Sequence, residues 1–209
     1  MPSGSRFIRS LRSPWQWIGV AIILWILALI AIVPTTGRPH SHSSFLMGAT
    51  HAVGLAMYAY ANDNDGKYPT GKSSTEVFQK LIDGGYITDP SLLYVKGLQV
   101  PGKTAATSNK LKPENVCWDV TIPADMNNAD PSLPLLFCTG YRVEYVPHGG
   151  ALPLAPGGIP GIVVYYCNNS AQFLPNDGKS DGFVPNLIPA TFDTKGVKYI
   201  QLTPDGPLQ

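Results

Sequence analysis

One uninterrupted apolar segment constrains this chain more than any other feature. Residues 15–33 read WQWIGVAIILWILALIAIV, and all but two of them are hydrophobic. As a helix the segment would be about 28 Å long, close to the ~30 Å hydrocarbon core of a bilayer. Trp15 and Trp17 stand at one end, where indole rings favour the membrane interface. The sequence therefore predicts a transmembrane helix over residues 14–34.

The arginines around this segment predict its orientation. Arg6, Arg9 and Arg12 precede it, whereas a single arginine follows it closely. Because positive charge is retained on the cytoplasmic side, the expected topology is single-pass in the cytoplasmic (inner) membrane, with the N-terminus in the cytoplasm. The predicted parts are a cytoplasmic basic segment, 1–13, a linker, 35–42, and a periplasmic or extracellular domain, 43–209.

A cleaved signal peptide is the alternative interpretation of the same segment. The apolar core of such a peptide is usually ~7–15 residues long and is followed by a small-x-small cleavage site. Here the apolar run is longer and no clean site of that kind stands at its end. A retained anchor is therefore expected.

The remainder of the chain predicts one globular domain without affinity for nucleic acid. The 209 residues suffice for one domain and a tail. Beyond position 38 there are 11 basic and 14 acidic residues, and a mildly acidic domain is a poor electrostatic partner for phosphate backbones. Only 14% of residues are charged, while 21 are Gly and 20 are Pro, which favours strands and long loops over a helical bundle.

Two helices are predicted after the linker. Apolar residues recur at spacings of three and four over 43–63, and Ser43 or Ser44 can cap the start. A shorter helix follows within STEVFQKLIDGGYI, with Ser74 as its expected cap and the two glycines, 84–85, as its end.

From residue 114 onward the pattern predicts strands, and hence an α+β fold in which an amphipathic helix packs on an antiparallel sheet. The segment 148–161 is rich in Gly and Pro and is predicted to be a solvent loop, and Asn168-Asn169 is predicted to form a type I′ turn. The predicted strands are 116–122, 135–137 running into 141–146, 162–167, 171–174 and 197–202. The predicted core includes Val53, Met57, Tyr60, Phe78, Leu81, Val163, Tyr165, Phe173 and Ile200.

The stretch YAYANDNDGKYPTG, residues 58–71, could be a metal loop, a catalytic acid pair or the end of a helix. In an EF-hand register with Gly66 at position 6, Ala61 and Lys72 would occupy ligand positions 1 and 12, so the motif fails. Asp63 and Asp65 lie among turn formers, where carboxylates are normally solvated. We therefore interpret the stretch as a helix stop and turn, after which Tyr68-Pro69 packs back.

A second loop could hold calcium. The segment PNDGKSDGF, 175–183, offers oxygen atoms from Asn176, Asp177 and Asp181, whereas calcium prefers about six to eight oxygen ligands. Asp-Gly pairs are ordinary turn residues, and a plain polar turn is the preferred interpretation. No metal ligand and no cofactor are assigned.

The remaining reactive residues give no catalytic motif. Cys117, Cys138 and Cys167 could form one disulfide and leave one thiol, or could be buried small hydrophobes. His51 and His148 are more typical of structural or solvated side chains than of catalysts. No nucleophile elbow, HExxH sequence or phosphate-binding glycine loop is present, so the chain is not expected to be an enzyme.

The helix-ending stretch resembles that of the type IV pilin-like proteins, most closely the pseudopilins of type II secretion. The resemblance covers about 40 residues and implies a pilin-like α/β roll, filament assembly or protein transport, and contacts through the N-terminal helix with like subunits or secretion-system proteins as well as membrane lipid. The residues that carry it are Met57, Tyr58, Asp65, Gly66, Lys67, Tyr68, Pro69, Thr70, Gly85, Tyr86 and Ile87.

One family feature is missing. Precursors of this family carry a small residue, an apolar residue and then a Glu five positions into the mature chain. The first acidic residue here is Asp63, so that processing site is absent and the chain is expected to keep its N-terminus. The expected function is a membrane-anchored structural or assembly component of a secretion or filament system. The alternative is an extracytoplasmic binding module that displays loops 101–113, 123–134 and 148–161 to a ligand or envelope polymer.

Overall fold

The computed structural model describes residues 42–95, 102–154, 161–179 and 181–208. The chain divides into two compact units, Met1–Pro39 and His40–Gln209, and every described residue belongs to the second. The predicted basic segment and transmembrane helix, and all of the linker except residue 42, therefore lie outside the described residues. Within the described part, no helix is both long enough and apolar enough to cross a bilayer.

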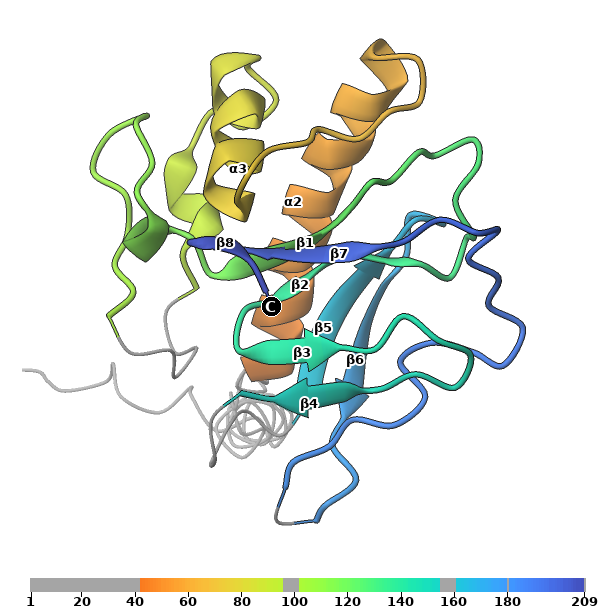
Figure 1. Ribbon diagram of the computed structural model, residues 1–209. Coiled ribbons are helices and arrows are strands. Elements are labelled where there is room, and N and C mark those ends of the chain that lie inside the picture. Colours follow the sequence, from red (N-terminus) through yellow and green to blue (C-terminus); the bar gives the residue numbers. More distant parts are fainter. Residues whose placement is uncertain (1–41, 96–101, 155–160, 180, 209) are drawn as a thin grey trace, which may run out of the picture. The chain divides into compact units, whose positions relative to one another are not determined.

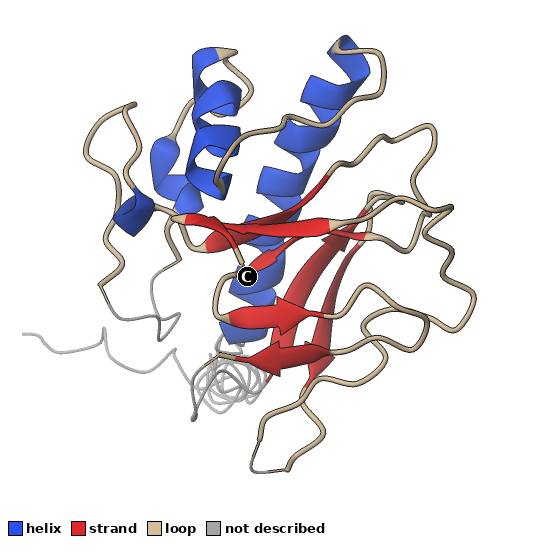
Figure 2. Cartoon of the chain, viewed as in Figure 1, coloured by secondary structure: helices blue, strands red, loops and turns tan. Residues whose placement is uncertain are grey.

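The described residues form two helices and eight strands, an α+β arrangement that confirms the predicted class (Figures 1 and 2). The main sheet is antiparallel, with strand order β6-β5-β2-β1-β7-β8, and β3 pairs with β4 in a separate two-stranded sheet. The elements are α2 (His42–Asp63), α3 (Ser74–Asp83), the 3₁₀ turns η1 (Pro90–Leu93) and η2 (Pro113–Asn115), β1 (Trp118–Ile122), β2 (Pro134–Cys138), β3 (Tyr141–Val143), β4 (Ala151–Pro153), β5 (Gly161–Tyr166), β6 (Ala171–Pro175), β7 (Ile200–Thr203) and β8 (Gly206–Pro207).

The stretch that follows α2 is a helix stop, as predicted. The Asn64 side-chain amide donates to the Tyr60 carbonyl at 2.7 Å, and the Gly66 N–H donates to the Ala61 carbonyl at 2.8 Å. Gly66 has φ +82°, a conformation that suits a residue without Cβ at the end of a helix. The Gly66 carbonyl then accepts from the Met126 N–H at 2.8 Å, and Tyr68 is buried. The turn therefore fastens the end of α2 to the segment after β1.

The cap of α3 is one residue earlier than predicted. The Ser73 hydroxyl, and not that of Ser74, accepts from the Glu76 N–H at 3.2 Å, while the Glu76 carboxylate accepts from the Lys72 N–H. Ser74 is buried instead, and its hydroxyl donates to the Trp118 carbonyl at 2.7 Å. Either serine could cap the helix as judged from the sequence. Ser73 does so because the Ser74 hydroxyl is used in the contact with β1.

The helices cover one face of the main sheet. α2 packs on β5, β2 and β6, and α3 packs on β1 and β7 (Figure 1). α2 approaches the sheet closely at Gly54, where an added Cβ would lie 2.4 Å from the Tyr165 ring. A glycine is therefore required where the helix crosses this ring.

The second face of the sheet is covered as well. Tyr165 faces α2, and the register places Leu136, Val120 and Leu202 on that same face. Because neighbouring residues of a strand point to opposite faces, Gln201 lies on the other one, where it bonds with β3. Strands β2 and β5 are consequently buried along their whole length.

Four sequence predictions need correction here. The segment 148–161 contains β4, because Ala151 pairs with Val143 and also exchanges hydrogen bonds with Val184. The strand predicted to run from 135–137 into 141–146 is broken at Gly140, which has φ +103°.

The third correction concerns the turn between β5 and β6. Asn169 alone takes a positive φ, +63°, and the Tyr166 N–H donates to the Ser170 carbonyl, so the loop has three residues rather than a type I′ pair. The fourth concerns β7, which begins at Ile200 and not at 197, because Val197 closes a turn on the Thr194 carbonyl.

The predicted core is largely confirmed. One residue is wrong: Ile200 is 39% exposed, although Leu202 on the same face of β7 is covered. Tyr60 and Phe173 are only partly buried. Those that are fully buried are Val53, Met57, Phe78, Leu81, Val163 and Tyr165.

Candidate functional site

The outward side of α2 is the most unusual surface of the domain. No Asp, Glu, Lys or Arg occurs between His42 and Asn62. Phe45 is 58% exposed and Leu55 is 41% exposed, and Ala59 further along is exposed as well. A surface helix normally carries charged residues opposite its buried face. The outward side of this helix is instead mostly apolar, with Ser44 and His51 as exposed polar residues among the apolar ones.

An apolar groove of about 490 Å³ lies where the first turns of α2 meet η1. It contains no charged side chain. Phe45 and Leu92 provide its exposed apolar surface. The lining residues are Ser44, Phe45, Gly48, Ala49, Ala52, Ser91, Leu92 and Tyr94.

The η1 side of this apolar groove is fixed by hydrogen bonds. The Asp89 carboxylate caps η1 by accepting from the Ser91 N–H at 2.9 Å and from the Ser91 hydroxyl at 2.8 Å, and these bonds lower the pKa of Asp89. The carbonyl of buried Leu93 accepts from the Cys117 N–H at 2.9 Å. The groove is thus held against the start of β1.

A second, polar groove of about 540 Å³ lies between α3 and the loop before η2. Gln79 organises it: its amide N–H donates to Asp83 and to the Asn109 carbonyl, and its amide oxygen accepts from the Leu111 N–H at 2.8 Å. The lining residues are Thr75, Glu76, Gln79, Asp83, Asn109, Lys110 and Leu111.

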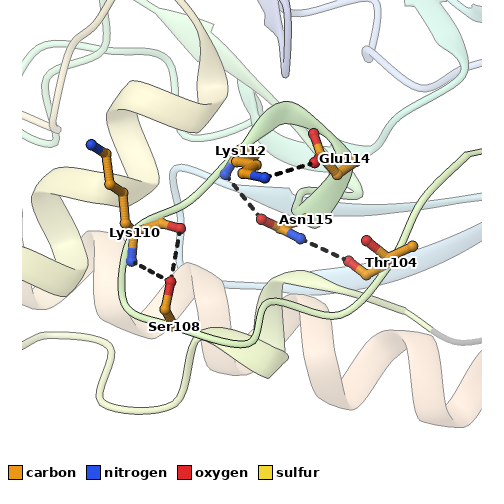
Figure 3. A network of polar contacts seen from close by, with 6 residues as sticks. All are labelled: Thr104, Ser108, Lys110, Lys112, Glu114 and Asn115. Atoms are coloured by element: carbon orange, nitrogen blue, oxygen red, sulfur yellow. Dashed lines mark hydrogen bonds and ion pairs between the residues drawn. The ribbon is translucent and has the colours of Figure 1, made fainter.

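The loop that borders the polar groove carries its own network of polar contacts (Figure 3). The Lys112 N–H donates to Asn115, whose side-chain amide donates in turn to the Thr104 carbonyl at 3.2 Å. The Lys112–Glu114 ion pair, at 3.7 Å, is largely exposed and adds little stability. In the predicted binding loop 101–113, residues 102–113 are therefore held by hydrogen bonds to the backbone more than by the ion pair.

A buried carboxyl lies between the main sheet and β3. Asp119 on β1 is fully buried, and its Oδ2 accepts from the Gln201 side-chain amide at 2.7 Å. Burial raises the pKa of Asp119 to about 7, although the Gln201 amide and the nearby Thr139 side chain lower it in part. Among the described residues, only the Gln201 amide donates a hydrogen bond to this carboxylate, and its Oδ1 has no partner.

Gln201, on β7, links its own strand to β1 and to β3. Its amide N–H groups donate to Asp119 and to the Tyr141 carbonyl at 2.6 Å, while its amide oxygen accepts from the Val143 N–H at 3.1 Å. Neither Asp119 nor Gln201 belongs to a motif that marks it in the sequence. The cluster is enclosed and lies in neither groove, so its role is to hold β3 on the sheet.

The acidic and histidine residues that the sequence offered as candidate site residues do not come together in one site. Asp63 accepts from the Tyr86 hydroxyl at 3.0 Å, and Asp65 is an exposed turn residue with φ +55°. His51 packs edge-on against Tyr165 with ring centroids 6.1 Å apart, and His148 is exposed. Among the described residues, no three His, Cys, Asp or Glu side chains are grouped as a metal site would require.

The cysteines are all free thiols, and the register explains why two of them do not meet. Cys138 lies opposite Trp118, so neighbouring Cys117 points to the other face of the sheet. Burial raises the pKa of both thiols. Neither is positioned as a nucleophile.

The three side chains proposed as calcium ligands in the 175–183 loop each accept a hydrogen bond within the loop. Asp177 accepts from the Lys179 N–H at 3.0 Å and pairs with the Lys179 ammonium at 3.2 Å, which lowers the pKa of Asp177. The Asn176 and Asp181 side chains accept from backbone N–H groups of Gly178 and Phe183. These are the bonds of polar turns.

Comparison with known proteins gave no match: no protein family, no curated protein sequence and no solved structure is detectably similar to this chain.

Proposed function

We propose that this chain is a membrane-anchored structural or assembly component of a secretion or filament system, with its pilin-like domain, residues 43–209, outside the cytoplasmic membrane. The observation that carries the proposal is the uncharged outward side of α2, which follows in sequence a segment able to span a bilayer. The protein acts by packing and not by catalysis. Its partners are membrane lipid and like subunits or secretion-system proteins, and it does not bind nucleic acid.

The physical argument is that an exposed apolar helix side calls for a partner. Contiguous exposed apolar surface on a soluble domain marks a contact site. Phe45 and Ala59 are 14 residues apart, so the exposed side extends for about 21 Å along the helix. Small outward residues such as Gly48 and Ala59 allow a second helix to approach closely.

The membrane arrangement and the packing are separately testable. In spheroplasts, added protease should digest the domain, whereas full protection with the membrane intact would reject an extracytoplasmic location. For packing, Leu55→Cys in the full chain, with Cys167→Ala as background, should give a covalent dimer with a short bis-maleimide.

Val146→Cys is the matched control for the cross-linking experiment. Val146 is 52% exposed, comparable with the 41% of Leu55, but it lies after β3 and far from α2 in sequence. If Leu55→Cys gives no more dimer than Val146→Cys, α2 does not meet a like subunit and the proposal loses its main support.

The polar groove favours a second candidate, an extracytoplasmic binding module for an envelope polymer. Carboxylate and ammonium groups of Glu76, Asp83 and Lys110 line it together, a set that can bond to hydroxyl and amide groups of a glycan. Soluble peptidoglycan fragments should then shift the amide NMR signals of Gln79 and Leu111. Unchanged signals at millimolar ligand would exclude this function.

A further inference from the structure

We propose that the apolar groove between α2 and η1 rests on the bilayer surface, with Phe45 and Leu92 inserted at the boundary between lipid headgroups and acyl chains. This inference rests on the membrane anchorage proposed above, and it goes further by assigning a lipid-contacting face to the domain itself. It divides the exposed side of α2: the end at Phe45 is assigned to lipid, and the part at Leu55 and Ala59 is left for like subunits.

The composition of the groove suits the interface. It exposes one aromatic and one leucine side chain, Phe45 and Leu92, and Tyr94 adds an amphipathic ring at its edge. None of the residues that line the groove is charged, which lowers the cost of inserting them. The Asp89–Ser91 hydrogen bonds hold Leu92 in place before contact, which reduces the entropy lost on insertion.

The chain itself brings this groove to a membrane. Eleven residues separate Val33, the last residue of the apolar run, from Phe45. Even fully extended, that connection spans only about 40 Å. Tethering at such a distance gives the groove a high effective concentration of lipid, so a contact that is weak in isolation is populated.

The size of the groove argues for lipid and against a second copy of the chain. Eight residues line it, whereas a stable protein–protein interface uses roughly 20–30 residues a side. An interfacial contact needs no such area, because a few apolar side chains added to an existing anchor suffice.

The test uses the full chain reconstituted in phosphatidylcholine vesicles. Phe45→Cys and Leu92→Cys, each with Cys167→Ala, are labelled with a nitroxide, and collisions with oxygen and with a water-soluble nickel chelate are measured by electron paramagnetic resonance. Val146→Cys is the control. The ratio of oxygen to nickel collisions should be at least threefold higher at positions 45 and 92 than at 146, and should not change with the protein-to-lipid ratio.

Each other outcome overturns the inference in a recognisable way. Equal ratios at the three positions, in a chain that floats with the vesicles, overturn the lipid contact while leaving the anchorage intact. Protection at 45 and 92 that grows with the protein-to-lipid ratio assigns the groove to a second copy instead. A chain that does not float with the vesicles overturns both this inference and the anchorage.

Discussion

Replacing Asp119 with Asn should change how the stability of the domain depends on pH. The carboxyl is fully buried, and burial raises its pKa to about 7. An unfolded Asp has a pKa of about 3.9. Below pH ~4 the carboxyl is protonated in both states, and its protonated form is the one that the buried site favours.

The sign and size of the effect follow from the two pKa values. As the pH rises from about 4 to 7, the unfolded chain releases this proton and the folded chain keeps it, so unfolding becomes easier by ~1.4 kcal/mol per pH unit. Across the window the wild-type domain should lose about 4 kcal/mol relative to Asp119→Asn. The loss ends once the folded carboxyl also ionises.

The assay is urea unfolding of residues 40–209, followed by circular dichroism at several pH values from 4 to 8. Other groups also have pKa values shifted by folding, and that of Asp130, for example, is lowered, so only the difference between the two proteins isolates Asp119. Asn can still accept from the Gln201 amide, and its own cost does not vary with pH. Free energies that stay parallel from pH 4 to 8 would refute a buried, protonated carboxyl.

Three further predictions concern packing and metal binding. Phe78→Ala should lose about 3–5 kcal/mol of unfolding free energy, because the ring is fully buried in α3, and a loss below ~1 kcal/mol would contradict its place in the core. Gly54→Ala should be destabilised by about 1–3 kcal/mol, because its Cβ would meet the Tyr165 ring at 2.4 Å. Gly48→Ala, whose Cβ meets nothing within 4 Å, should be neutral or slightly stabilised, and equal effects at both glycines would contradict the close approach. One millimolar calcium should leave the melting temperature unchanged, whereas a site with a Kd of ~10 µM would add about 2.7 kcal/mol, and a rise that disappears in Asp177→Ala would contradict a plain turn.

The helices and most strands could be predicted because local signals agree with the tertiary structure. The apolar spacing and polar stop of α2, and the paired glycines after α3, each determine an element locally. The Ser73 cap was missed because its rival, Ser74, is withdrawn by a contact with Trp118, 44 residues away. No local pattern contains that information.

The second covered face of the sheet was not predictable for the same reason. Asp119 alternates with Trp118 and Val120, which is the pattern of a strand with a solvated side. The layer that buries it contains β4, which comes from a segment rich in Gly and Pro with no alternation of its own. The burial of Asp119, and therefore its raised pKa, depends on a layer that forms only when β3 pairs with β4.

The apolar groove was missed from sequence because its two sides lie about 45 residues apart. Phe45 belongs to the apolar spacing over 43–63, which predicts a buried side chain, and Leu92 belongs to a short turn with no periodic signal. An uncharged stretch from 42 to 62 was visible, and it could have indicated a helix with two apolar sides.

The turn that ends α2 also determines how the domain would carry a mechanical load. A pull applied through the N-terminus of α2 acts along the helix, which lies on β5, β2 and β6 and is fastened at its far end to Met126 through Gly66. The helix can then move only by sliding over the sheet while breaking the Gly66 and Tyr68 backbone bonds together. Such a shearing arrangement shares the force among many contacts, so the domain should withstand tension on its anchor far better than tension that peels β8 from the edge of the sheet.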